Sequence, residues 1–252
     1  MRKVKHFTHK IFSVKNSKTH KILTILFVKI KFKLSMKKIL KQNNNKIILY
    51  KKNSKIVEYP QIKELEININ GSNNLIELKE PFNFKDLSIN MYGDNNVLKI
   101  DENSRFLHAR INLNSGTNVR IGKGFTCCSG LVIRNKHALG VSIRIGNDCM
   151  FSENVHIRST DGHTIFDKDT LEPINKPENI VIGDHVWLGD AVCVLKGSII
   201  PDNSVVGAKA VVTKAFDEPN VILAGIPARI IKRNINWDRM GYNRYLEEHK
   251  KA

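Results

Sequence analysis

The sequence predicts an all-β protein built as a parallel β-helix, in which short strands coil around one axis and stack on each other. Two observations support this prediction: aliphatic residues recur every six positions, and a looser 22-residue repeat lies upstream of them. A period of six matches neither an α-helix nor simple strand alternation, but it fits a short strand followed by a corner. Three such units close one triangular coil, so the repeats predict a solenoid.

The six-residue repeats, or hexads, are most regular in the C-terminal half. Their aliphatic positions are Ile182, Leu188, Val194, Ile200, Val206 and Val212. Each is followed four positions later by Val186, Val192, Ser198, Ser204, Ala210 and finally Phe216. The same period occurs earlier at Ile121, Cys127, Ile133, Ile145, Phe151 and Ile157. We expect the aliphatic residue to point inward and stack on its equivalent in the next coil, while the small residue fills the corner.

The upstream repeat predicts larger coils, with one coil per 22 residues. Its three copies begin at Gly71, Gly93 and Ser115. The alignment makes Asn74, Asn96 and Asn118 equivalent, and likewise Leu75, Val97 and Val119. We expect the asparagines to form a ladder inside the coils rather than to bind a ligand. The predicted organisation is therefore a basic N-terminal arm (1–57), a β-helix domain (58–234) and a short helical tail (235–252).

The charge of the chain is concentrated in the arm. The net charge is +17, and residues 1–55 contain 17 Lys and Arg residues but no Asp or Glu. The rest of the chain is neutral, which argues against nucleic acid as a partner. The apolar run 22–28 falls short of the roughly 20 residues of a membrane span, and no small-residue cleavage site follows it. Two interpretations stay open: attachment to an anionic membrane surface, and a basic strand or helix packed on the body.

The four cysteines match no zinc or redox spacing, so free thiols in a reducing cytosol are the simplest interpretation. We expect no metal, and a cytoplasmic protein, peripheral on the inner membrane face if the arm binds lipid. Two segments, 136–140 and 163–177, interrupt the hexads. Loops that leave a regular scaffold often carry function.

Four further motifs complete the pattern: 158–163 (RSTDGH), 182–189 (IGDHVWLG), 212–214 (VTK) and 224–229 (AGIPAR). With the hexads, they resemble the hexapeptide-repeat acyltransferases, and especially the bacterial capsule and sialic-acid O-acetyltransferases. The resemblance covers roughly residues 119 to 238. It implies a left-handed parallel β-helix, a homotrimer with sites between subunits, and transfer of acetyl from acetyl-CoA to a hydroxyl of a cell-surface saccharide.

His163 is the candidate general base. Moving acetyl to an alcohol requires removal of the hydroxyl proton, and imidazole titrates near neutral pH. His163 stands where a coil ends and a loop begins, so its ring can reach a cleft. Asp161, Asp167 or a backbone carbonyl is a candidate to orient the imidazole, and the sequence does not choose among them.

Trp187 precedes an inward leucine and must point outward. The resemblance places a tryptophan here at the active site, although packing between subunits is an alternative role. Small residues Gly189 and Ala208 would admit the pantetheine arm of the donor, while Thr213, Lys214 and Arg229 match the coenzyme-binding end of the family. Two alternatives remain: an amino-sugar N-acetyltransferase or longer-chain acyltransferase on the same scaffold, and a non-catalytic β-helix scaffold.

Overall fold

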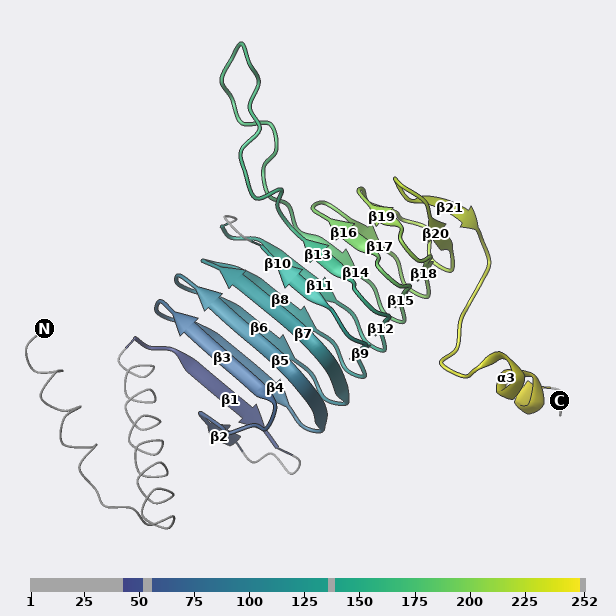
Figure 1. Cartoon of the computed structure of the whole chain (residues 1–252), viewed down its shortest axis with the longest axis horizontal. Coiled ribbons are helices and arrows are strands. Elements are labelled where there is room, and N and C mark those ends of the chain that lie inside the picture. The colour runs from purple at the N-terminus through teal and green to yellow at the C-terminus, as the bar shows by residue number, and fades with distance from the viewer. Residues whose placement is uncertain (1–42, 52–55, 136–138, 250–252) are drawn as a thin grey trace, which may run out of the picture. The chain divides into compact units, whose positions relative to one another are not determined.

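The computed structural model describes residues 43–51, 56–135 and 139–249, and these form a β-solenoid followed by a short helix (Figure 1). Most of the predicted arm, residues 1–42, lies outside the described residues. Within the described part, no helix is long and apolar enough to cross a membrane.

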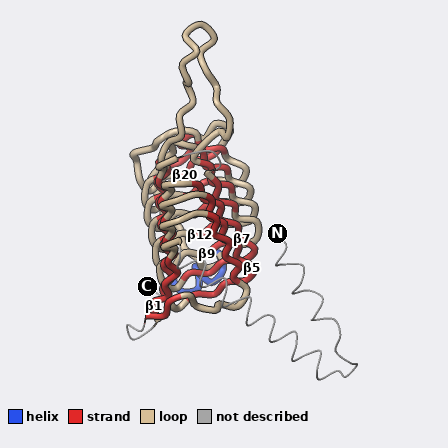
Figure 2. The backbone as a smooth tube through the Cα atoms, turned by 90° about the vertical axis from the view of Figure 1, so that its left-hand side faces the viewer, coloured by secondary structure: helices blue, strands red, loops and turns tan. Residues whose placement is uncertain are grey.

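The strands stack in three columns, and the chain visits them in the same order in each coil. Column one holds β1 (Lys46–Tyr50), β4 (Leu75–Lys79), β6 (Val97–Ile100), β8 (Asn118–Ile121), β11 (Ser142–Ile145), β14 (Ile180–Ile182) and β17 (Ile199–Ile200). Neighbours in this column pair in parallel, and β2 (Ile56–Glu58) adds an antiparallel edge beside β1. Figure 2 shows the coils stacked one on another, with the loop after β13 projecting from them.

Columns two and three share the two longest strands, β5 (Phe82–Tyr92) and β7 (Ser104–Asn114), which turn a corner between them. Column two continues through β9 (Thr126–Cys127), β12 (Met150–Phe151), β15 (Trp187–Leu188), β18 (Val205–Val206) and β20 (Ile222–Ala224). Column three comprises β3 (Leu65–Asn70), β10 (Val132–Arg134), β13 (His156–Arg158), β16 (Cys193–Leu195) and β19 (Val211–Val212). Antiparallel β21 (Arg229–Lys232) closes the solenoid, and helix α3 (Tyr242–His249) follows.

The core confirms the predicted hexads. All six aliphatic positions of the C-terminal run are fully buried, and Ile182 stacks in register between Ile145 and Ile200. Aromatic rings continue the stacking at one corner, where the centroids of Phe106 and Phe125 lie 5.0 Å apart. Because each coil repeats the same environment, burial of one apolar residue per strand extends into a continuous core.

The predicted asparagine ladder exists, but its register differs from the sequence alignment. The Asn96 amide donates to Asn74 Oδ1 at 2.9 Å, and both side chains are buried. In the next coil, Thr117 and not Asn118 lies beside Asn96, and its amide donates to Asn96 Oδ1. Asn118 is instead the register partner of Val97. The assignment of Asn118 to the ladder, and of Val119 to the place of Val97, was wrong: the third repeat is one residue shorter.

The start of the solenoid also differs from the prediction. Strand β1 pairs in parallel with β4 and so belongs to the first coil, although it precedes the expected boundary at Glu58. Asn45, just before β1, accepts a 3.0 Å hydrogen bond from Asn74 and begins the buried ladder. Buried residues alternate along β1, with Ile47 and Leu49 pointing inward. A short alternating strand preceded by a run of asparagines gave no hexad signal.

Candidate functional site

The predicted loop after β13 projects as a long hairpin from the corner between columns three and one (Figure 1). Its two arms pair through the amide of Ile174, which donates to the oxygen of Ile165 at 2.9 Å. At the tip, the carboxylate of Asp167 accepts a 2.8 Å hydrogen bond from the amide of Thr170. His163 lies at the base of the hairpin, where the chain leaves the solenoid.

Asn175 joins the two sides of the hairpin base. Its amide donates to the main-chain oxygen of His163 at 2.8 Å and to Asp161 Oδ2 at 2.9 Å. Its side-chain oxygen accepts a 2.7 Å hydrogen bond from the amide of Ile165. A single side chain that returns from the far end of the loop therefore holds the backbone at His163 and Ile165 and the carboxylate of Asp161.

Lys196 ties this base to the following coil. Its Nζ lies 2.5 Å from Asp161 Oδ2. The hydrogen bond from Lys196, followed by that from Asn175, lowers the pKa of Asp161 below its ordinary value. These contacts occupy the oxygen that Asp161 directs toward the hairpin, so the geometry indicates that Asp161 holds the loop base. Asp167, the other carboxylate considered, serves the turn at the tip.

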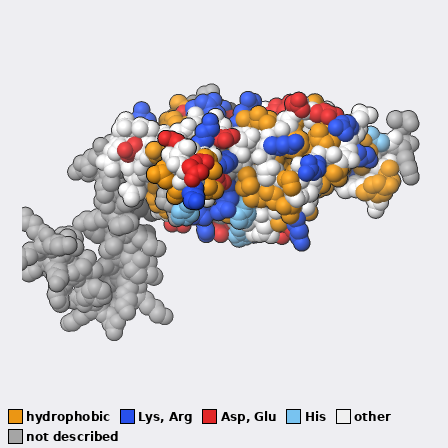
Figure 3. Space-filling model, turned by 90° about the horizontal axis from the view of Figure 1, so that it is seen from above, with side chains coloured by type: hydrophobic (Ala, Val, Ile, Leu, Met, Phe, Trp, Pro, Cys, Tyr) orange, Lys and Arg blue, Asp and Glu red, His pale blue; other side chains and the backbone are white. Residues whose placement is uncertain are grey.

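Two arginines share the pocket with His163. The pocket has a volume of about 140 Å³ and is lined by Arg134, Arg158, Thr160, Asp161, Gly162 and His163. Arg134 and Arg158 are register partners on β10 and β13, so their side chains stack on the outside of adjacent coils. Among the described residues neither arginine forms an ion pair, and both remain available to an anion. The view from the side of the hairpin shows Lys and Arg side chains spread among acidic and apolar ones (Figure 3).

Trp187 lies elsewhere on the solenoid. It opens β15 in column two, whereas His163 lies at the corner between columns three and one, which is opposite column two in a three-sided coil. Its indole nitrogen donates to Ser152 Oγ at 3.4 Å, and its ring lies beside that of Trp237, with centroids 6.0 Å apart. A single chain therefore does not bring Trp187 and His163 together.

The proposed donor-binding residues fall into two groups. Gly189 and Ala208 face each other in adjacent coils, and a Cβ on Gly189 would meet the Ala208 nitrogen at 2.7 Å. Glycine at this position is thus required by coil stacking itself. Thr213 and Lys214 lie after column three with exposed side chains, and Arg229 opens β21 beside Ala224.

Several site residues were not found from the sequence. Asn175 and Lys196 carry no motif that marks them. Arg134 and Arg158 could have been found, because they directly follow the equivalent inward residues Ile133 and Ile157. No group of three or more His, Cys, Asp or Glu residues in the described part is placed to hold a metal ion.

A three-column parallel solenoid with a histidine-bearing hairpin at one corner defines a hexapeptide-repeat protein, and the comparisons with known proteins agree. No family model matches the chain. The crystal structure of the polySia-specific acetyltransferase NeuO is 31% identical and superposes with a TM-score of 0.67, covering 81% of this chain and 91% of that one. The polysialic acid O-acetyltransferase OatWY is 30% identical, with a TM-score of 0.63 and coverage of 75% and 94%. The chain therefore belongs to the left-handed β-helix, hexapeptide-repeat acetyltransferases.

Curated sequences give a consistent but shorter match. The polysialic acid O-acetyltransferase of Escherichia coli O1:K1 is 35% identical over 139 residues, which cover 54% of this chain and 43% of that protein. For the next two relatives, from Neisseria meningitidis and Escherichia coli K12, the match spans 47% and 60% of their length. The chain thus spans about half the length of the curated relatives it matches.

Proposed function

We propose that the protein transfers acetyl from acetyl-CoA to a hydroxyl of an acidic cell-surface saccharide, with His163 as the general base. The observation that supports this most directly is the pocket in which His163 stands beside Arg134 and Arg158. Family membership supplies the reaction class, and the two arginines supply the charge preference. Hydrogen bonds from arginine to a carboxylate are charge-assisted and often bidentate, which suits an acidic sugar.

The reaction requires one proton to move. As the acceptor oxygen attacks the thioester carbonyl, the His163 imidazole takes the hydroxyl proton, and a tetrahedral intermediate forms. Collapse of that intermediate breaks the carbon–sulfur bond, and the imidazolium returns the proton to the departing thiolate. Direct transfer in a ternary complex needs no covalent enzyme intermediate, only two substrates held in line. The network of Asn175, Asp161 and Lys196 would keep the His163 backbone fixed while this occurs.

The donor would lie along the C-terminal coils. Lys214 and Arg229 are exposed cations and would meet the phosphates of acetyl-CoA, while Ala208 is a small exposed residue that would leave room for the pantetheine arm. Thr213 and Gly189 complete the group that the family resemblance assigns to this end. Because Gly189 is constrained by its neighbour in the stack, a substitution there would disturb the fold as well as any donor groove.

The complete site would need a second copy of the chain. His163 and Trp187 lie on different sides of one solenoid, so their meeting in one site requires His163 of one protomer and Trp187 of another. The hairpin also exposes four large apolar side chains, Ile165, Phe166, Leu171 and Ile174, each at least 54% accessible. Such exposure on one loop is typical of a surface that a partner covers. A closed, threefold homotrimer would give every subunit the same contact.

The defining experiment compares the saccharide coat of cells with and without the gene by mass spectrometry, and seeks an acetyl increment. In parallel, purified protein with acetyl-CoA is offered an acidic sugar with only hydroxyls, a neutral sugar and an amino sugar. Turnover on the acidic hydroxyl sugar supports the proposal. Preference for the amino sugar would indicate an N-acetyltransferase, and absence of acetyl-CoA binding by calorimetry would indicate a scaffold.

Arg158→Gln tests the charge preference. The variant should raise the KM for the acidic acceptor about tenfold, the usual loss from one charge-assisted hydrogen bond, while the KM for acetyl-CoA is unchanged. Arg144→Gln is a matched control, because Arg144 lies on column one outside the pocket. An equal KM increase in both variants would show that the effect is general surface charge.

A further inference from the structure

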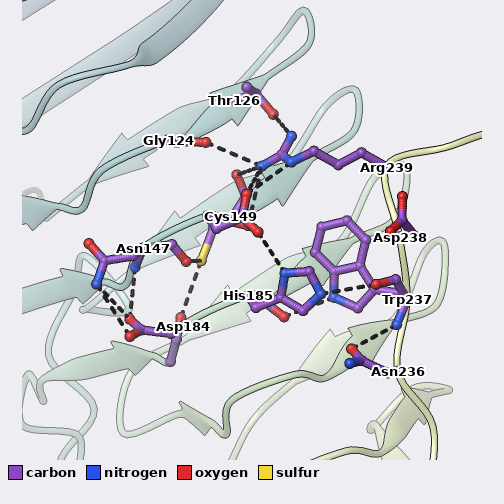
Figure 4. Close-up of polar contacts among 12 residues, drawn as sticks. Gly124, Thr126, Asn147, Cys149, Asp184, His185, Asn236, Trp237, Asp238 and Arg239 are labelled. Atoms are coloured by element: carbon purple, nitrogen blue, oxygen red, sulfur yellow. Dashed lines mark hydrogen bonds and ion pairs between the residues drawn. The ribbon is translucent and has the colours of Figure 1, made fainter.

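The segment after β21 runs back along the corner between columns one and two, where Trp237 and Arg239 meet His185 and Cys149 (Figure 4), and the Trp237 ring lies beside that of Trp187. Residues from several coils meet it there. The side-chain amide of Asn220 donates to the main-chain oxygen of Ile235 at 3.0 Å. In the preceding coils, His185 contacts Trp237 and Asp148 contacts Arg239. The tail thus crosses several coils in the direction opposite to that in which the solenoid grows.

Trp237 makes three contacts with His185. Its indole nitrogen donates to the main-chain oxygen of His185 at 2.8 Å, and its own main-chain oxygen lies 3.0 Å from His185 Nε2. The two rings stack with centroids 4.2 Å apart and planes within 8°. The other nitrogen of His185 lies 2.7 Å from Asp148 Oδ2, which fixes the imidazole against the solenoid. The orientation of the Trp237 ring is therefore determined by the corner residues below it.

Arg239 fastens the same segment two residues later. Its guanidinium forms an ion pair with Asp148 at 2.9 Å and donates to Thr126 Oγ1 at 2.8 Å. It also donates to the main-chain oxygens of Gly124, Asp148 and Cys149, each at 3.2 Å. With Trp237, His185 and Asp148, Arg239 forms what we call the C-terminal clamp. The guanidinium also lies 5.8 Å from the Trp237 ring, so the two halves of the clamp touch.

We propose that Trp237 is a positioning residue for Trp187, and that the C-terminal clamp exists to hold it there. This inference rests on the proposed presence of Trp187 at the active site. Trp187 opens a two-residue strand and points outward between its register partners Met150 and Val205, where it is half-buried and its indole nitrogen donates one long hydrogen bond to Ser152. Trp237 adds a ring contact from the tail, and the two indoles meet at an interplanar angle of 47°. A half-buried indole with one long polar contact is less restrained in its rotamer than one that also packs against a second ring.

The distribution of contacts in the tail favours a role in positioning Trp187 over a role that only attaches the tail to the solenoid. Ordering a residue costs backbone entropy, so a tail outside the core must gain its order from specific contacts. Beyond the hydrogen bonds between Ile235 and Asn220, those contacts are made by Trp237 and Arg239, and Trp237 lies beside Trp187. Helix α3, which follows immediately, buries none of its residues. The contacts that order the tail are therefore made before helix α3, where Trp237 lies beside the indole of Trp187.

The chain has two tryptophans, Trp187 and Trp237, which makes the proposal directly measurable. Trp237→Phe and Trp237→Ala each leave Trp187 as the sole tryptophan. Time-resolved fluorescence anisotropy of full-length protein should show Trp187 immobile in Trp237→Phe and locally mobile in Trp237→Ala. The kcat should fall on the order of tenfold in Trp237→Ala and return toward wild type in Trp237→Phe, because misplacement of a site group slows the chemical step.

A second pair of variants protects the test against simple misfolding. Arg239→Gln, made in the Trp237→Phe background so that Trp187 stays the sole tryptophan, releases the clamp and should mobilise Trp187 relative to Trp237→Phe alone. Arg233→Gln removes an equally charged residue from the same tail, where Arg233 pairs with Glu218, and should leave both anisotropy and kcat unchanged. If Trp187 stays immobile in Trp237→Ala and Arg239→Gln, the proposal is overturned, even if the melting temperature falls. If Trp187→Phe is fully active, the proposed function of Trp187 fails while the anisotropy still decides whether Trp237 positions it.

Discussion

The side-chain amide of Asn175 donates to the main-chain oxygen of His163 at 2.8 Å, and so the end of the projecting hairpin fixes its beginning. Asn175→Ala should therefore lower kcat on the order of tenfold, since the backbone that carries the proposed base would lose its support. The KM for acetyl-CoA should stay near the wild-type value. Asn68→Ala, which removes an exposed asparagine pair with Asn90, serves as the control and should be silent. Equal kcat values in the two variants would show that Asn175 does not support the active site.

The ion pair between Asp161 and Lys196 predicts a particular pH dependence. The folded-state pKa of Asp161 is lowered, so its contribution to stability is present above the unfolded-state pKa near 4 and is lost as pH falls through the folded-state value. Urea unfolding of wild type and Asp161→Asn should therefore differ by a constant amount from pH 5 to 7. The difference should shrink toward zero below pH 4. A difference that grows on acidification would contradict the pairing.

His163→Ala should reduce kcat by a factor on the order of 10²–10⁴, the usual contribution of a general base. Acetyl-CoA affinity, measured by calorimetry, should stay close to wild type because His163 is assigned no role in holding the donor. A matched control is His156→Ala, because His156 is an exposed histidine on β13, the strand that leads into the loop. Near-normal turnover of His163→Ala would remove it from the role.

A shared site predicts complementation between inactive subunits. His163→Ala and Trp187→Ala should each be strongly impaired, yet their co-expression should restore about a quarter of wild-type activity if each site combines one residue from either chain of a trimer and subunits mix at random. Light scattering checks the trimer directly. Failure to complement, with trimers present, would contradict a site that combines His163 of one subunit with Trp187 of another.

The basic arm should bind anionic membrane surfaces. Each Lys or Arg near an anionic leaflet contributes about 1 kcal/mol, and apolar residues interleaved with them, such as Phe27 and Phe32, would add shallow insertion. Full-length protein should sediment with anionic liposomes, less so at high salt. A form beginning at Asn43, which keeps β1, should stay in solution and acetylate a free sugar. Equal sedimentation with neutral vesicles would contradict the electrostatic mechanism, and unfolding of the shorter form would show that the arm is part of the folded structure.

The fold could be predicted because a solenoid repeats one environment along the chain. Ile182, Leu188 and Val194 occupy equivalent inward positions, so the six-residue period is visible without knowledge of any distant contact. The same local logic marked the hairpin at His163 as a break in the pattern. It failed at Asn118, where a corner one residue shorter moves the register without changing the composition. It also missed β1, whose alternating residues, preceded by a run of asparagines, resemble an ordinary edge strand.

The sequence by itself determined the stacked coils, the inward residues and the location of the candidate base, because each depends on residues a few positions apart. Only the tertiary structure decided what surrounds that base. Lys196 reaches Asp161 from the next coil, and Trp237 reaches Trp187 after the chain has turned back along the outside of the solenoid. Stacking brings coils together at fixed spacing whatever the length of the loops between them. Side chains that are far apart in sequence therefore become neighbours, and no local pattern records which of them will meet.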